Sequence, residues 1–129
     1  MDKWELKPLE SIGKIHFGMD RAEVRATLSS EYREFKKTAR SRNTTDDFGG
    51  YHVFYTPDNK CEAVEVFEGV IVSLNGTEIF PATIDTVKDM IPDLEEDEGS
   101  YISPKQSICL TISSGKVESI LVGQSGYYD

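Results

Sequence analysis

The stretch IGKIHFGMDRAEVRATL, residues 12–28, decides the fold that the sequence predicts. A short strand over residues 14–17 leads to Gly18, which has no Cβ and permits a sharp turn. A helix then begins at Asp20, whose carboxylate can accept a hydrogen bond from the amide of Glu23 in a capping arrangement. Apolar side chains recur along this helix at helical spacing, which predicts one buried face.

The pattern returns 63 residues later in NGTEIFPATIDTVKDMI, residues 75–91. The shared positions are glycine, aromatic and helix-core positions: Gly13 with Gly76, Phe17 with Phe80, Val24 with Val87, and Leu28 with Ile91. A second correspondence, 56 residues apart, aligns CEAVEVF after Lys60 with VESILVG after Lys116. The sequence therefore predicts half-repeats at about 12–69 and 75–123. Two unrelated segments with the same hydrophobic pattern are the alternative.

Turn signals between the apolar runs predict hairpins at residues 57–60, 75–76 and 114–115. Each half then contains a strand, a helix and further strands. We expect residues 1–129 to form a single α+β domain, an antiparallel meander sheet with two helices built from a repeated strand-helix-meander unit. Residues 1–11 are expected to be a short edge strand or a tether.

The composition is that of a soluble globular protein with an acidic surface. The chain is 38% hydrophobic, and its formal net charge is -9. A negative surface repels phosphate, so nucleic acids and anionic membranes are not expected as partners, whereas a basic protein would be attracted. Solubility alone would also explain the charge.

The location that the sequence predicts is the cytoplasm. No apolar run is long enough to cross a bilayer, and the first ten residues do not contain the apolar core of a signal peptide. Cys61 and Cys109 lie in apolar, strand-like runs and are expected to be reduced core thiols.

The residues that could carry chemistry do not form a catalytic motif. His16 and His52 are the only histidines, and neither lies in a nucleophile or metal-binding pattern, so both are expected to be structural or surface residues. Glycine-rich phosphate loops are also absent from the sequence. We therefore predict no enzyme activity, no catalytic residue, no metal and no cofactor.

Two charged segments are candidates for binding. Residues 93–98 place five carboxylates in six positions and are expected to form an exposed turn. Residues 33–42 hold five of the fourteen basic residues, and this segment could be a solvated loop, a salt-bridging arm or part of a site. Carboxylates near exposed tyrosines suit a basic partner; in the alternative, Tyr101 is core and the tail is disordered. The predicted partner-binding residues are Asp93, Glu95, Glu96, Asp97, Glu98, Tyr101, Tyr127 and Tyr128.

The motif IGKIHFGMDRAEV resembles the opening of small bacterial proteins with a BamE-like unit, a helix-plus-meander fold found in outer-membrane assembly lipoproteins. The tandem arrangement resembles the β-lactamase inhibitor protein family, which duplicates such a unit. In contrast to these families, no secretory signal, lipobox cysteine or disulfide pattern is expected for this chain. This resemblance implies an inhibitor-like scaffold.

A second resemblance involves NTTDDFGGYHVFY, the Asn75-Gly76 hairpin and the terminal GYYD. These stretches look like those of small acidic immunity proteins that bind bacterial polymorphic or contact-dependent toxins. The resemblance implies a non-enzymatic cytosolic protein, a monomer or weak dimer, that occludes the active site of a basic toxin domain such as a nuclease. The alternatives are a small-molecule- or peptide-binding domain, an enzyme of unrecognised type, and a BamE-like accessory scaffold.

Overall fold

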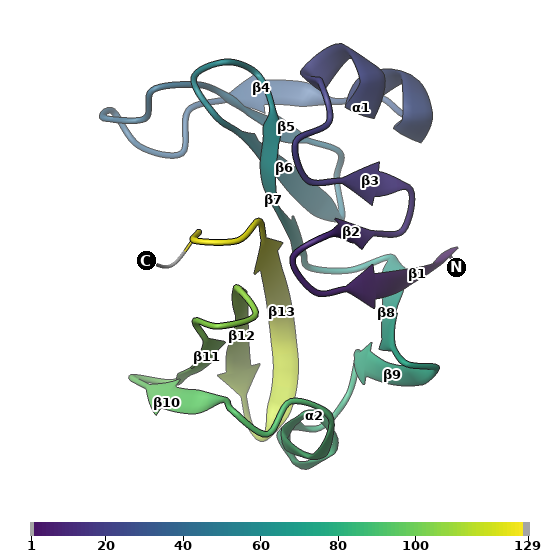
Figure 1. Cartoon of the computed structure of the whole chain (residues 1–129), viewed down its shortest axis with the longest axis vertical. Helices are drawn as coiled ribbons and strands as arrows, with labels where there is room; N and C mark the ends of the chain where they lie inside the picture. Colours follow the sequence, from purple (N-terminus) through teal and green to yellow (C-terminus); the bar gives the residue numbers. More distant parts are fainter. Residues whose placement is uncertain (1, 128–129) are drawn as a thin grey trace.

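The computed structural model describes residues 2–127, which form two β-sheets and two helices (Figure 1). The fold is α+β, as predicted, and the helices are α1 (Arg21–Leu28) and α2 (Ile84–Met90). The larger sheet is antiparallel throughout. Its strands, in spatial order, are β10 (Glu95–Asp97), β11 (Ser100–Ser103), β12 (Ile108–Ser113), β13 (Lys116–Gly123), β7 (Cys61–Val66), β6 (Tyr51–Tyr55), β5 (Thr45–Asp47) and β4 (Arg33–Phe35).

The smaller sheet is mixed and contains the N-terminal strand at its centre. In spatial order its strands are β3 (Ile15–His16), β2 (Ser11–Ile12), β1 (Asp2–Lys7), β8 (Val70–Leu74) and β9 (Thr77–Phe80). The expectation that residues 1–11 form an edge strand or a tether was wrong, because β1 pairs with β2 on one side and runs parallel to β8 on the other. The alternation of buried Trp4 and Leu6 predicts a strand but does not reveal its neighbours.

The predicted pseudo-repeat is confirmed by the strand order of both sheets. In the larger sheet the order outward from β7 is β6, β5, β4, and the order outward from β13 is β12, β11, β10. Equivalent backbone contacts join each helix to its hairpin. The amide of Arg21 donates to the carbonyl oxygen of Asn59 (2.9 Å), and the amide of Ile84 donates to that of Gly115 (3.0 Å). The two halves are therefore related by a pseudo-two-fold arrangement about β7 and β13.

The start of α1 differs from the prediction in one respect, and α2 starts in the same way. Asp20 and Thr83 occupy the N-cap positions, but neither side chain makes a capping hydrogen bond. The Asp20 carboxylate pairs with the ammonium group of Lys60 instead. The turns follow the prediction, since Asn59 and Asn75 adopt φ of 60° and 52°.

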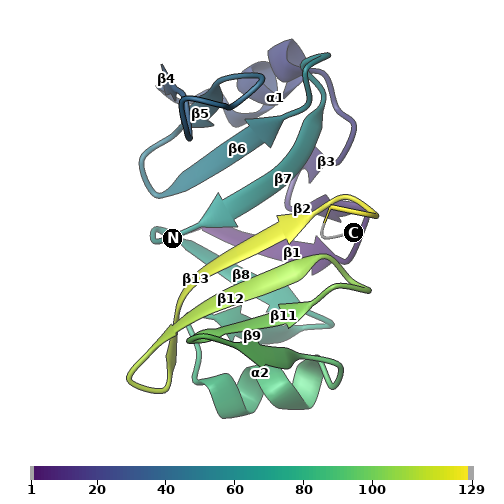
Figure 2. The same ribbon diagram turned by 90° about the vertical axis from the view of Figure 1, so that its left-hand side faces the viewer.

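The core lies on one face of the larger sheet, which we call the inner face. The helices and the smaller sheet cover this face (Figure 1). Fully buried side chains come from both halves, among them Leu6, Ile12, Ile15, Val24, Val53, Val64, Ile79, Val87, Ile108, Leu110 and Ile120. The opposite face, which we call the outer face, has no helix in front of β6, β7, β13 and β12 (Figure 2). Among the residues described, no helix is long and apolar enough to cross a membrane.

The segment predicted as an acidic turn is in part a strand. Glu95–Asp97 form β10, the edge of the larger sheet, with one turn before it at Pro92 and Asp93 and another after it at Glu98 and Gly99, whose φ angles are 46° and 84°. A strand tolerates these like charges because it lies at an edge, where every side chain is exposed. Thr45–Asp47, expected within a connection, likewise form a strand, β5.

Candidate functional site

One row of side chains crosses the whole outer face. Residues paired across neighbouring strands lie on the same face of a sheet, and successive residues of a strand lie on opposite faces. The neighbours of the core residues Val53 and Val64 therefore lie outside. The row takes one residue from each of the eight strands: Glu95, Ile102, Cys109, Leu121, Glu65, His52, Asp47 and Arg33. Ile102, Cys109 and Leu121 form an apolar part of the row, and the members on either side of them are ionisable.

Aromatic rings gather around His52, in the part of this row that belongs to the first half-repeat. The centroid of the His52 ring lies 5.1 Å from that of Phe35, 6.5 Å from that of Phe54 and 4.8 Å from that of Phe67. Phe54 is buried, whereas Phe67 is 38% exposed and is among the most exposed large apolar residues of the described chain. An aromatic cluster that is partly open to solvent on an uncovered sheet face is typical of an interaction surface.

Two carboxylates lie half-buried beside the aromatic cluster. Burial raises the pKa of Glu65, and the positive charges of Lys37 and His52 only partly oppose this effect. Burial also raises the pKa of Glu62, again with Lys37 acting in the opposite direction. The fold therefore disfavours the charged forms of both groups, so these carboxylates do not stabilise the protein in the ionised state. Such groups in an accessible position are candidates for binding.

A pocket of about 310 Å³ lies between the outer face and the β4–β5 connection. Its walls include Lys37, Phe54, Glu62 and Tyr127. The ammonium nitrogen of Lys37 lies 4.6 Å from the centroid of the Phe54 ring, a cation–π contact. The Tyr127 ring packs over Gly123, where a Cβ atom would lie 2.8 Å from the ring, and burial raises the pKa of Tyr127 to about 12. The basic connection thus borders the pocket instead of extending freely into solvent.

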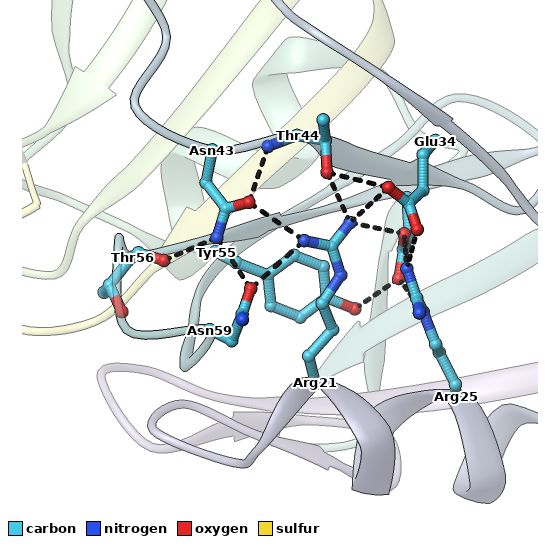
Figure 3. Close-up of polar contacts among 9 residues, drawn as sticks. Arg21, Arg25, Glu34, Asn43, Thr44, Tyr55, Thr56 and Asn59 are labelled. Atoms are coloured by element: carbon cyan, nitrogen blue, oxygen red, sulfur yellow. Dashed lines mark hydrogen bonds and ion pairs between the residues drawn. The ribbon is translucent and has the colours of Figure 1, made fainter.

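A buried ionic network fastens this connection to α1 (Figure 3). Asp46 has no exposed side-chain surface. One carboxylate oxygen accepts hydrogen bonds from Arg21 Nη2 and Arg25 Nη2, both at 2.8 Å. The other accepts from Arg25 Nε at 2.9 Å and from the Tyr55 hydroxyl at 2.8 Å. The burial of Asp46 raises its pKa, but these hydrogen bonds outweigh burial and the pKa lies below the usual value.

The same arginines hold both ends of the β4–β5 connection. Arg21 donates to Asn43 (3.0 Å) and Thr44 (2.8 Å) at its C-terminal end, as Figure 3 shows. Arg25 donates to Glu34 (2.8 Å), in the strand that precedes the connection. The network therefore fixes where the connection starts and ends relative to the outer face.

The structure brings together half of the predicted partner-binding residues, those on β10 and β11. Glu95 and Asp97 pair with Ile102 and Ser100, which places both carboxylates on the outer face. Glu96 lies on the opposite side of the strand, where the Tyr101 hydroxyl donates to it at 3.4 Å. The three carboxylates of β10, which we call the acidic edge, are therefore divided between the outer and the inner face of the larger sheet.

The remaining predicted residues have other positions. Asp93 accepts hydrogen bonds from Ser103 (2.6 Å) and Gln106 (2.8 Å), which hold its pKa below the usual value and tie down a loop. Glu98 lies in the exposed turn. Tyr127 follows β13 in the chain and packs over Gly123 of that strand, three strands from β10, and Tyr128 lies outside the described residues. These residues do not converge on one site.

Sequence reasoning missed the centre of the outer face, which contains Glu62, Glu65 and Phe67. Strict alternation in CEAVEVF places Glu65 opposite Val64 and Val66 but places Glu62 on the same face as these valines. In the structure Phe54 pairs with Ala63 and Tyr55 with Cys61, so an irregularity in the strand skips Glu62, and this irregularity was not predicted. The alternation also does not show which face the helices cover. Cys61 is buried in the core, as expected, and burial raises its pKa to about 12. The expectation for Cys109 was wrong, because this residue is half-buried on the outer face.

The small-molecule alternative requires a pocket, and the aromatic residues of β6 that could line one are Tyr51, Phe54 and Tyr55. Phe54 and Tyr55 line the pocket of about 310 Å³, whereas Tyr51 lines others, beside Trp4 and Gly50. Within residues 2–127, no group of three or more potential ligand residues is placed to hold a metal ion.

Comparisons with protein-family models, curated proteins and solved structures gave no match to this chain. The resemblances to BamE-like units, to the inhibitor family and to toxin immunity proteins therefore stay predictions from the motifs.

Proposed function

We propose that the chain is a non-enzymatic binding protein that neutralises a basic protein domain, in the manner of a toxin immunity protein, by covering that domain with its outer face. The observation that carries the proposal is the outer face itself. No helix covers it, it spans eight strands, and it combines partly exposed aromatic and apolar side chains with half-buried carboxylates.

The chemistry of the outer face favours a basic partner. Glu62 and Glu65 are ionisable groups whose charged forms lack full compensation within the chain, as the raised pKa values of their carboxyls indicate. A lysine or arginine of the partner would supply the missing counter-charge. Its aliphatic stem would cover the neighbouring apolar part of the row. The net charge of -9 would speed the approach of such a partner.

The acidic edge has a secondary role in this proposal. Glu95 and Asp97 extend the outer face at its far end and are exposed, so they act as a rim. Rim charges affect the association rate and its dependence on salt more than the lifetime of a complex. Glu65, near the centre and half-buried, is expected to determine the lifetime.

The test compares the wild type with three charge-reversal variants that each change the net charge equally. Glu65→Lys alters the centre of the outer face, Glu98→Lys alters the acidic turn, and Glu78→Lys alters an exposed position on β9 in the smaller sheet. Each folded protein is immobilised and exposed to an extract of the source cell. Any retained protein is then purified, and its dissociation constant and its inhibition are measured at low and high salt.

We expect a basic protein that binds the wild type and Glu78→Lys equally, binds Glu98→Lys more slowly, and loses at least tenfold in affinity for Glu65→Lys. Its own activity should fall stoichiometrically on addition of the wild type. Equal affinity for the wild type and Glu65→Lys would show that the partner does not bind the centre of the outer face. A small molecule retained in place of a protein would favour the binding-domain alternative.

A further inference from the structure

Lys37 is the residue that connects the basic segment to the outer face. It belongs to the β4–β5 connection, where the first half-repeat is longer than the second. Although Lys37 is exposed, its ammonium nitrogen lies 4.6 Å from the centroid of the buried Phe54 ring. Its positive charge also acts on the carboxyls of Glu62 and Glu65, where it opposes the larger effect of burial, which raises both pKa values. An internal cation thus lies where an aromatic ring and two carboxylates meet.

We propose that this place, formed by Phe54, Glu62 and Glu65, is a receptor for a lysine or arginine side chain of the partner, and that Lys37 occupies it in the free protein. The inference rests on the proposed function, because it names the group that the outer face recognises. The presence of an ammonium group there shows which ligand chemistry the receptor accepts: an organic cation over a ring, close to carboxylates.

Lys37 has the properties of a displaceable occupant. Its contact with Phe54 is an exposed cation–π interaction, which is weak, and its flexible stem allows the ammonium group to swing into solvent. A guanidinium group stacks on an aromatic face and binds a carboxylate through two parallel hydrogen bonds, so an arginine would be the stronger ligand. The adjoining pocket of about 310 Å³ leaves space for an entering side chain.

The network at α1 explains why Lys37 is held close to the receptor. Arg21 binds Asn43 and Thr44 after the connection, and Arg25 binds Glu34 before it. With both ends fixed, only the middle of the connection can move. A short displacement of Lys37 would then open the receptor without unfolding the strands.

The chain offers a matched control for Lys37. Lys36 is adjacent and exposed, so Lys36→Ala and Lys37→Ala make the same change in net charge. The probe is a short peptide of alternating arginine and serine, titrated into the isotope-labelled protein. Affinity is measured by calorimetry, and the binding position by amide chemical shifts. Lys37→Arg keeps a cation in the receptor, and Glu62→Gln removes one of its carboxylates.

We expect Lys37→Ala to bind the probe about two- to fivefold more tightly than Lys36→Ala, because one exposed cation–π contact favours the occupied receptor by about that factor. Lys37→Arg should bind no more tightly than the wild type, and Glu62→Gln should bind more weakly. The largest shifts in Lys37→Ala should lie at Phe54, Glu62 and Glu65.

Equal affinities for Lys37→Ala and Lys36→Ala would overturn the receptor while leaving the proposed function standing. Changes in amide chemical shift that are spread evenly over all acidic positions, or confined to β10, would overturn the receptor as well. Failure of the proposed function is recognised separately, by a partner that binds Glu65→Lys as tightly as it binds the wild type.

Discussion

Asp46→Asn is the change that tests most deeply how the structure holds α1 and the β4–β5 connection together. The Asp46 carboxylate is fully buried and accepts four hydrogen bonds, three of them from two guanidinium groups. Asparagine preserves the size of the side chain but replaces one oxygen with an amide that faces donors. It also leaves Arg21 and Arg25 without their buried counter-charge.

The expected loss follows from these contacts. Removing one partner of a buried ion pair costs about 3–5 kcal/mol, because a desolvated charge is left uncompensated. A domain of this size has a free energy of unfolding of roughly 5–15 kcal/mol. The variant should therefore stay folded at room temperature while its Tm falls by roughly 10–20 °C.

The pH dependence of this loss has a definite sign. The folded-state pKa of Asp46 lies below its ordinary value of 3.8, so the stabilisation is present above that value and is lost as the pH falls through the folded-state pKa. The difference between wild type and Asp46→Asn should be largest near neutral pH and should shrink in acid.

Urea unfolding followed by circular dichroism at several pH values measures this difference. Asp89→Asn makes the same chemical change at an exposed position of α2 and should alter the free energy of unfolding by less than about 0.5 kcal/mol. A loss below about 1 kcal/mol for Asp46→Asn, or a loss independent of pH, would refute the argument that this carboxylate anchors the two arginines.

Three other changes test separate parts of the structure. Glu65→Gln should raise the Tm at neutral pH and weaken binding of a basic partner, because the folded state disfavours this charge; a lower Tm would contradict the burial argument. Gly50→Ala should cost about 1–3 kcal/mol, measured by urea unfolding, since its Cβ would lie 2.2 Å from the carbonyl oxygen of Glu68; a neutral effect would show that this turn yields easily. Val24→Ala and Val87→Ala, at equivalent buried positions of the two helices, should each cost about 2 kcal/mol by the same assay, and a large inequality would count against equivalent halves.

Much of the fold could be predicted from the sequence because local signals and the internal repeat agree. Asn75 and Gly76 both adopt positive φ, as a two-residue hairpin requires, and the echo of residues 12–28 in residues 75–91 corresponds to two equivalent strand-helix units. The central position of β1 could not be predicted, because it depends on a parallel partner, β8, far away in the sequence.

The candidate site was harder to predict than the fold. Arg21 lies on the helix face where an apolar residue is expected, and its partners lie 22–38 residues away in the chain. Asp46 follows polar residues and resembles part of a loop, although it is a fully buried strand residue. The residues of the outer face could not be identified, because this requires knowing which side of the sheet the helices cover. The alternation of side chains within a strand is the same whichever side is covered.

Carboxyl footprinting of the complex tests directly whether the partner binds the outer face. Exposed carboxylates are modified with a carbodiimide and an amine, and the extent at each residue is read by mass spectrometry for the free and the bound protein. We predict that Glu62, Glu65 and Glu95 lose reactivity in the complex, while Glu23 on α1 and Glu78 on β9 react equally in both states. Protection of Glu23 or Glu78, with unchanged reactivity on the outer face, would contradict the account.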